Sequence, residues 1–168
     1  MRFFWRGVLK LGILSDTHDN VPQVRKAVAL FNREMVDLVL HAGDYVAPFS
    51  VKPLFELQCD FMGVWGNNDG DKMALHRISQ GKIEQTFRQE EYDGKKILLG
   101  HYFETLDALV ASQAYSLIVY GHTHEPEMRK QGQTLVLNPG ECGAWLYGES
   151  TVAVVDLDSL EGEIVTLP

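Results

Sequence analysis

The stretch VLKLGILSDTHDN, residues 8–20, is the key to interpreting the whole chain. Its apolar run at residues 8–14 predicts a β-strand, and Asp16 and His18 follow directly. Apolar residues then recur at three- and four-residue spacing, which predicts an amphipathic helix with Pro22 near its start. The positions of this pattern are Val21, Val24, Val28, Phe31 and Met35. The first unit of the fold is therefore a strand, two polar side chains and a helix.

The same order of strand, polar residues and helix recurs along the first half of the chain. Residues 37–40 and 60–65 are apolar runs that predict strands. Residues 49–57 and 71–80 each predict a short helix. This alternation implies parallel strands joined by right-handed crossovers.

From Lys82 onward, strands follow one another through short turns such as Asp93-Gly94, so antiparallel pairing is expected. The predicted strands of this part are residues 83–92, 93–99, 116–119, 134–139, 151–158 and 162–168. A helix is predicted at residues 103–114. We therefore expect an α/β fold of mixed sheets with helices outside, in a single domain that spans residues 1–168.

Five of the predicted strands end in a loop that carries Asp, Asn or His. The carboxyl ends of parallel strands meet at one edge of a sheet, so we expect these side chains to gather there. The candidates are Asp16, His18, Asp44, Asn67, Asn68, Asp69, His101, His122 and His124. A glycine precedes each of the last four loops, where it would permit a tight turn and close backbone approach. These glycines are Gly43, Gly66, Gly100 and Gly121.

The residue types and their spacing indicate a metal centre. Asp16 and His18 are two residues apart, as are His122 and His124, so each pair points to one side of an extended backbone. Carboxylate, amide and imidazole donors without thiolate suit Mn, Fe, Co, Ni or Zn in an open centre better than a structural zinc site. The donors outnumber the ligands of one tetrahedral ion. Two divalent ions that share a bridging carboxylate account for the number, and we expect manganese.

Composition and charge limit the partners of the chain. Its 168 residues carry a formal net charge of −8, which argues against an extended nucleic-acid footprint because such a surface needs clustered Lys and Arg. No apolar run approaches the ~20 residues of a membrane span. Cys59 and Cys142 are predicted to be free thiols of a reducing compartment, and we expect a cytoplasmic protein. Residues 1–7 are interpreted as an N-terminal extension, or as the product of an upstream start codon with Val8 as the true beginning.

The donor residues fall into motifs that resemble those of the calcineurin-like metallophosphoesterases. The family motifs read D-x-H, G-D, G-N-x-[D/E], a lone H and G-H-x-H, and residues 16–124 contain them in this order. The segment NPGEC, residues 138–142, is similar to the small single-domain prokaryotic phosphodiesterase branch. The resemblance implies a four-layer αββα sandwich of two mixed β-sheets flanked by helices, with a binuclear metal site at the carboxyl ends of strands. It implies one ion held by Asp16, His18, Asp44 and His124, and another held by Asp44, Asn67, His101 and His122.

Two positions depart from the family pattern. Many relatives have His where this chain has Asn68, and an amide donates a hydrogen bond but no proton, so we expect weak activity on poor leaving groups. Much of the branch reads T-H-G-H where this chain reads LLGHYF. Either His101 or Leu99 then takes the ligand position, and the strand count favours His101.

The expected reaction is hydrolysis of a small phosphodiester by in-line attack of a hydroxide that bridges two metal ions. Asp44 would bridge the ions, Asn68 would act on the phosphate, and Asp69 would orient Asn68 or a metal-bound water. The alternatives are a phosphomonoester or dinucleoside-polyphosphate phosphatase, and a non-catalytic interaction scaffold of the same fold, as in the retromer scaffold subunit.

The remaining candidates receive structural interpretations. His41 and His76 are predicted to be packed or surface histidines. Asn138 and the turn after it could touch substrate. The Trp-Leu-Tyr group at residues 145–147 is apolar, and it is either a contact of a homo-oligomer or a buried patch.

Overall fold

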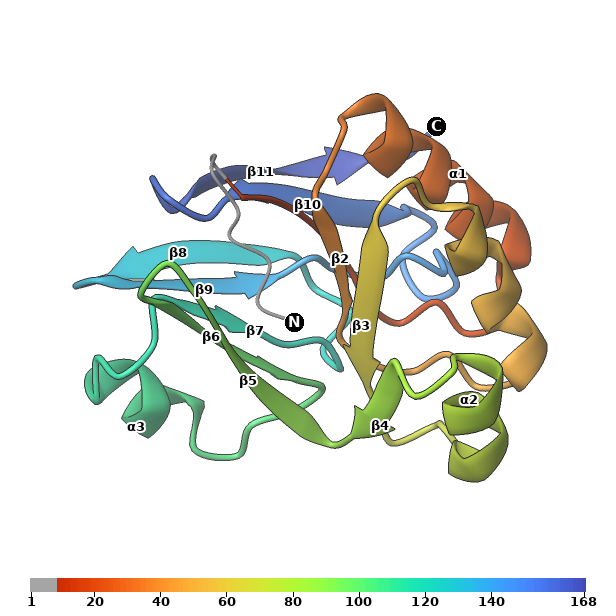
Figure 1. Ribbon diagram of the computed structural model, residues 1–168, viewed down its shortest axis with the longest axis horizontal. Helices are drawn as coiled ribbons and strands as arrows, with labels where there is room; N and C mark the ends of the chain where they lie inside the picture. Colours follow the sequence, from red (N-terminus) through yellow and green to blue (C-terminus); the bar gives the residue numbers. More distant parts are fainter. Residues whose placement is uncertain (1–8) are drawn as a thin grey trace.

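The computed structural model describes residues 9–168, so the predicted extension at residues 1–7 and the proposed start at Val8 lie outside the described residues. The described chain forms two β-sheets that pack face to face, with helices on both outer faces (Figure 1). This arrangement confirms the expected fold of two mixed sheets flanked by helices. Within residues 9–168, no helix is long and apolar enough to cross a membrane.

Sheet A has six strands in the order β11-β10-β1-β2-β3-β4. Its strands are β1 (Lys10–Leu14), β2 (Leu38–His41), β3 (Asp60–Val64), β4 (Ile83–Gln85), β10 (Thr151–Asp156) and β11 (Glu161–Thr166). Sheet B has five strands in the order β5-β6-β7-β9-β8. Its strands are β5 (Phe87–Tyr92), β6 (Lys95–Gly100), β7 (Leu117–Val119), β8 (Glu127–Gln131) and β9 (Thr134–Asn138). Strands β1 to β4 are parallel to one another, as are β6, β7 and β9.

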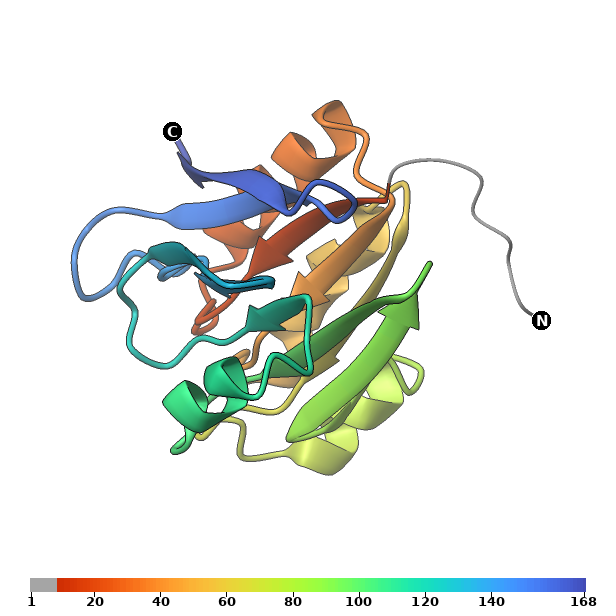
Figure 2. The same cartoon turned by 90° about the vertical axis from the view of Figure 1, so that its left-hand side faces the viewer.

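Helices cover the outer face of each sheet (Figures 1 and 2). Sheet A carries α1 (Val21–Arg33), the 3₁₀ helix η1 (Pro48–Glu56) and α2 (Lys72–Ile78), whereas sheet B carries α3 (Leu106–Ala111). Between the sheets, Leu11 and Ile13 of β1 belong to one buried cluster with Leu99 and Val119 of sheet B. Burial of each such side chain contributes about 1.5–3 kcal/mol, which fixes the two sheets against each other.

Helix α1 follows its predicted pattern except at its end. Asn20 caps the helix by accepting a hydrogen bond from the N–H of Gln23, and Phe31 packs so closely on Gly12 that a Cβ there would lie 2.7 Å from the ring. Met35 was predicted on the buried face, but it lies beyond the last helical turn and is 81% exposed. It has a left-handed φ of +51°, and Val36 N–H donates to Phe31 O, as in a Schellman motif that usually holds glycine.

Two predictions for the second half of the chain were wrong in detail, and one strand was missed. Residues 83–92 are not one strand: β4 pairs with β3 in sheet A, and β5 pairs with β6 in sheet B. The predicted helix at residues 103–114 is reduced to α3, Leu106–Ala111. Strand β8 was not predicted, because its sequence EMRKQ is almost entirely polar and its strand conformation comes from pairing with β9.

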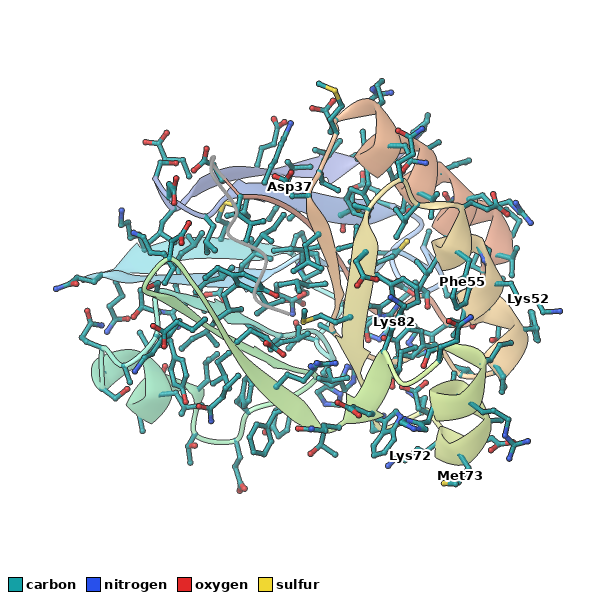
Figure 3. The ribbon with its side chains drawn as sticks, in the orientation of Figure 1. Asp37, Lys52, Phe55, Lys72, Met73 and Lys82 are labelled. Carbon is teal, nitrogen blue, oxygen red and sulfur yellow. The ribbon has the colours of Figure 1, made fainter. Side chains whose placement is uncertain are left out.

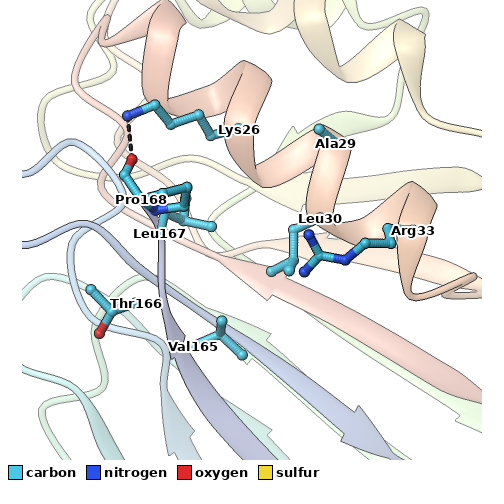
Figure 4. A pocket seen from close by; sticks show the side chains of 8 residues that line it. All are labelled: Lys26, Ala29, Leu30, Arg33, Val165, Thr166, Leu167 and Pro168. Carbon is cyan, nitrogen blue, oxygen red and sulfur yellow. Dashed lines mark hydrogen bonds between the residues drawn. The ribbon is translucent and has the colours of Figure 1, made fainter.

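Two surface features lie on the helical side of sheet A. Phe55 of η1 packs edge to face on Phe61 of β3, with ring centroids 5.4 Å apart, and Lys52 of η1 points outward (Figure 3). A shallow pocket lies between α1 and the last residues of the chain, where Lys26 donates a hydrogen bond to the carbonyl oxygen of Pro168 (Figure 4). None of the candidate donor residues lines this pocket.

Candidate metal centre

The loops after β1, β2, β3, β6 and β7 meet at one edge of the two sheets. Backbone hydrogen bonds join these loops across large sequence separations: Asp16 N–H donates to Gly43 O (3.0 Å), and Gly121 N–H donates to His101 O (3.0 Å). Parallel strands that end at one edge bring their following loops together. The structure therefore places the side chains of all seven predicted metal ligands in one cluster.

Asp16, His18 and His124, termed the Asp16 group, form one side of this cluster. Nε2 of His18 lies 3.7 Å from Oδ1 of Asp16, and Nε2 of His124 lies 3.4 Å from the same oxygen. Asp16 is completely buried, yet its Oδ1 and the Nε2 of His18 have no hydrogen-bond partner among residues 9–168. An unpaired buried polar atom costs about 1–3 kcal/mol, so these atoms are suited to a shared ligand.

Asn67, His101 and His122, termed the Asn67 group, form the other side. Oδ1 of Asn67 lies 2.8 Å from Nε2 of His101 and 2.8 Å from Nδ1 of His122. The other ring nitrogen of His101, Nδ1, lies 2.8 Å from Ala42 O, which leaves Nε2 to face the cluster. Leu99 is buried between the sheets instead, so the geometry places His101, and not Leu99, among the donors.

Asp44 lies between the two groups. Its Oδ2 is 3.6 Å from Nε2 of His18 and 3.4 Å from Nε2 of His101. Asn68 donates to the same carboxylate twice, from its backbone N–H to Oδ1 (2.8 Å) and from its side-chain amide to Oδ2 (2.7 Å). Burial by itself would raise the pKa of Asp44, but the nearby His101 imidazole and the two hydrogen bonds from Asn68 hold it below its ordinary value. The carboxylate is therefore ionised at neutral pH.

The two histidines nearest to Asp44 each respond to a neighbouring carboxylate. The Asp16 carboxylate raises the pKa of His18, and burial acts in the opposite direction. Burial lowers the pKa of His101, but the Asp44 carboxylate outweighs it and the net shift is upward. A cation is thus favoured at both positions, whether it is a proton or a metal ion.

The spacing of the donors fits divalent ions. Two atoms that each lie about 2.1 Å from one ion, at angles of about 90–110°, are roughly 3.0–3.4 Å apart. The carboxylate–imidazole separations of 3.4–3.7 Å are close to this range and longer than hydrogen bonds. The donor atoms of Asp16, His18 and His124 all lie within 4.8 Å of one another, and so do those of Asp16, Asp44 and His101.

Most of the ligand candidates have a left-handed backbone conformation. Their φ angles are +52° for Asp16, +40° for His18, +61° for Asp44, +71° for His122 and +62° for His124. Each such residue costs about 1–3 kcal/mol and persists only where surrounding contacts enforce it. Of the four glycines predicted to make the tight turns, only Gly43 has a positive φ. Gly66 and Gly121 instead allow close approach, because a Cβ would lie 2.1 Å from Oδ1 of Asp44 and 2.0 Å from Oγ of Ser15.

Asp69 supports the Asp44 loop from beneath. Its buried carboxylate accepts the backbone N–H groups of Asp44 (3.0 Å), Val46 (2.8 Å) and Gly66 (2.7 Å). Burial raises the pKa of Asp69, and these N–H groups act against that shift. Asp69 was expected to orient Asn68 or a metal-bound water; its contacts instead hold the backbone that presents Asp44.

Glu141 is a buried residue of the candidate centre that the sequence patterns did not single out. It is 1% exposed, and its Oε1 lies 3.3 Å from Nδ1 of His124. A carboxylate behind a histidine of this kind fixes the orientation of the ring. Its neighbour Asn138 was expected to touch substrate, but it is fully buried and donates to Gly121 O and Thr123 Oγ1. Both residues therefore support the loop of His122 and His124, and the signal in the sequence was the NPGEC segment.

The remaining predicted positions lie outside the cluster. His41 is buried beneath it, where Nδ1 accepts the N–H of Gly43 (3.1 Å) and burial lowers its pKa to about 3. His76 is half-buried on α2, with Nδ1 3.3 Å from Ile83 O. Both are packed side chains, as predicted. The Trp-Leu-Tyr group at residues 145–147 is exposed, so its interpretation as a buried patch was wrong.

Comparison with known proteins finds phosphodiesterases among those similar to this chain. The chain is 36% identical to a phosphodiesterase of Methanocaldococcus jannaschii over 165 residues, which cover 95% of this chain and 99% of the relative. It is 29% identical to phosphodiesterase YfcE of Escherichia coli K12 over 152 residues, or 79% of each chain.

Solved structures also match this chain over most of its length. A structure of an archaeal phosphodiesterase matches with a TM-score of 0.86 and 36% identity, covering 94% of this chain and 99% of the other. Vps29 of Entamoeba histolytica, crystallised with zinc, matches with a TM-score of 0.69 and 20% identity, covering 94% and 98%, which shows a shared fold. Residues 9–160 match the calcineurin-like phosphoesterase superfamily domain. This chain belongs to the calcineurin-like phosphoesterase superfamily.

Proposed function

We propose that this protein is a phosphodiesterase that requires two divalent metal ions, with manganese as the expected metal and Ni, Co, Fe or Zn as alternatives. The observation that carries the proposal is the position of the Asp44 carboxylate, 3.6 Å from His18 and 3.4 Å from His101, between two sets of nitrogen and oxygen donors. The relatives with the highest identities reported above are named phosphodiesterases, which supports the same reaction class.

The ligand sets follow from the two groups. Asp16, His18 and His124 would hold one ion and Asn67, His101 and His122 the other, with Asp44 shared between them. When bound, such a pair of ions lowers the pKa of water and neutralises phosphate oxygens during in-line attack at phosphorus. The chain itself keeps Asp44 ionised, fixes the ring of His101 through Ala42 O and holds the Asp44 loop through Asp69.

Asn68 sets the range of leaving groups. Its side-chain amide donates to Oδ2 of Asp44 and is exposed at the cluster, where it could also donate to a phosphate oxygen. An amide has no proton to give to a leaving alkoxide. Aryl esters, whose leaving groups need no protonation, are therefore the expected good substrates, and alkyl esters the poor ones.

The direct test is an activity panel of diesters, monoesters and nucleotides against a series of divalent metals. We expect hydrolysis of bis(p-nitrophenyl) phosphate with added manganese, and no hydrolysis after metal removal with a chelator. A preference for p-nitrophenyl phosphate would favour the monoesterase alternative. Absence of all activity with every metal would favour the interaction scaffold, for which the shared fold with Vps29 is the only support. A cytoplasmic location and a homo-oligomeric state stay predictions.

A further inference from the structure

Three exposed aromatic side chains stand on two loops at the candidate metal centre, the loop that carries His101 and the loop between β9 and β10. They are Tyr102 (59% exposed), Trp145 (64%) and Tyr147 (59%), termed the aromatic rim. Tyr102 directly follows His101, and the two others follow Glu141 in the loop that supports His124. A single exposed aromatic residue needs no explanation, but three on the loops of one site do.

Trp145 is exposed and at the same time fixed in place. Its indole N–H donates to His18 O (3.0 Å), and its backbone N–H donates to Oε1 of Glu141 (2.9 Å). The backbone N–H of Leu146 donates to the other oxygen of Glu141 (3.0 Å). Glu141 also lies 3.3 Å from His124, so the Trp145 loop is tied to two members of the Asp16 group. A ring held in this way loses little conformational entropy when a ligand packs on it.

Tyr102 extends this surface to the Asn67 group, whereas Tyr147 lies beside the loop of His124. The ring of Tyr102 lies 4.9 Å from the ring of His122 between centroids. The hydroxyl of Tyr147 is 3.5 Å from Oε1 of Glu125, which follows His124 in the sequence. Aromatic faces therefore stand beside both groups of ligand candidates.

Metal ions at the centre would bind the phosphate, which every phosphodiester contains. Discrimination between diesters must come from side chains that contact the ester substituents. Planar aromatic rings stack on Trp and Tyr faces with little regard to their hydrogen-bonding groups. We propose that the aromatic rim is a stacking subsite for a planar ester group of the substrate, either an aryl group or a nucleobase. This inference rests on the proposed phosphodiesterase function.

The test compares diesters with one leaving group and different second substituents. The substrates are the methyl, phenyl and thymidine-5′ esters of p-nitrophenyl phosphate, assayed with manganese. We expect kcat/KM for the phenyl or thymidine ester to exceed that of the methyl ester by about ten-fold. Trp145→Ala should lower kcat/KM for that aromatic ester by about ten-fold, mainly by raising KM. The methyl ester should change less than two-fold. A preference for the phenyl ester would identify an aryl group as the stacked substituent, and a preference for the thymidine ester would identify a nucleobase.

Two further variants separate stacking from support of His18. Trp145→Phe keeps a ring but loses the hydrogen bond to His18 O, so it should retain the preference for aromatic esters. Tyr102→Ala, on the other side of the cluster, should weaken the same preference even if Trp145→Ala does not fold. Phe55→Ala removes an exposed ring that packs on Phe61 of β3 and should leave the ester preference unchanged. Tryptophan fluorescence gives a separate measure of binding. Phenylphosphonate should quench it and methylphosphonate should not, and the quenching should be smaller in Trp145→Ala.

The outcomes are distinct. An equal loss for all three esters in Trp145→Ala and Trp145→Phe would mean that Trp145 only supports His18, and would overturn the inference. A change of oligomeric state in light scattering without loss of ester preference would assign the rim to contacts between copies, and would also overturn it. Failure of the wild-type protein to hydrolyse any of the esters would instead remove the proposed function.

Discussion

The Asp16 group and the Asn67 group differ in how the protein holds them. All three members of the Asp16 group have left-handed backbone, and three of its buried polar atoms have no hydrogen-bond partner among the described residues. In the Asn67 group only His122 is left-handed, and the side-chain oxygen of Asn67 lies within hydrogen-bond distance of both imidazole rings. The Asp16 group is therefore the more strained half and has unpaired atoms, whereas the Asn67 group is less strained and its side chains contact one another.

The difference shows that the Asp16 group depends on its surroundings. Strained residues persist only where neighbouring contacts enforce them, and here these contacts come from Glu141, from His41 and from the backbone bonds between loops. The Asn67 group has internal contacts that fix its side chains. We therefore expect changes beneath the Asp16 group to affect metal affinity and stability, and the following experiments test that contrast.

The largest expected effect is that of Asp44→Asn, because Asp44 serves both groups. The neutral amide removes the negative charge that the two sets of donors share, and we expect less than a hundredth of the wild-type rate on bis(p-nitrophenyl) phosphate with manganese. Asp158→Asn, an exposed substitution with the same change of charge, should keep full activity. Full activity of Asp44→Asn would refute the shared role of this carboxylate.

Glu141→Gln should weaken metal binding by about 10- to 100-fold, because the carboxylate behind His124 no longer orients the ring. Isothermal titration with manganese measures the change, and circular dichroism checks that the fold is intact. Glu161→Gln on the exposed strand β11 is the matched control. Unchanged affinity would show that the Asp16 group does not need this support.

His41 should make the protein sensitive to mild acid. Its pKa is about 3 in the folded protein against an ordinary value of 6.5, so below pH 6.5 the unfolded chain binds a proton that the folded chain excludes. Its stabilisation is therefore complete above pH 6.5 and is lost as pH falls, by about 2 kcal/mol between pH 6 and pH 4.5. Urea unfolding in the presence of a chelator measures this slope. His41→Asn should flatten it, and an equal slope in both proteins would contradict the assignment.

Met35→Gly gives the cost of left-handed backbone where no ligand is involved. Met35 is exposed at the C-terminal end of α1 with a φ of +51°, so glycine should raise the free energy of unfolding by about 1 kcal/mol without changing activity. Met35→Ala keeps the Cβ and should give no gain. If glycine does not stabilise, the strain assigned to Asp16, His18 and His124 is overestimated as well.

Much of the site could be predicted because its signals are local. Each donor follows an apolar run, and the parallel strands inferred from the βαβ order bring their ends to one edge. The choice between His101 and Leu99 also followed from counting along one strand, and the structure places His101 in the cluster. Pro22, Val24 and Phe31 marked α1 correctly for the same reason.

The sequence by itself therefore determined the alternation of parallel strands and helices in the first half and the side chains that gather at one sheet edge, since apolar periodicity and short motifs are local properties. Only the tertiary structure decided that residues 83–92 divide between two sheets, that polar β8 is a strand, and that Glu141 stands behind His124. It also decided that most of the ligand candidates take the left-handed conformation, whereas only one of the four predicted glycines does. These features depend on contacts between residues far apart in the chain, whose energies outweigh local preference.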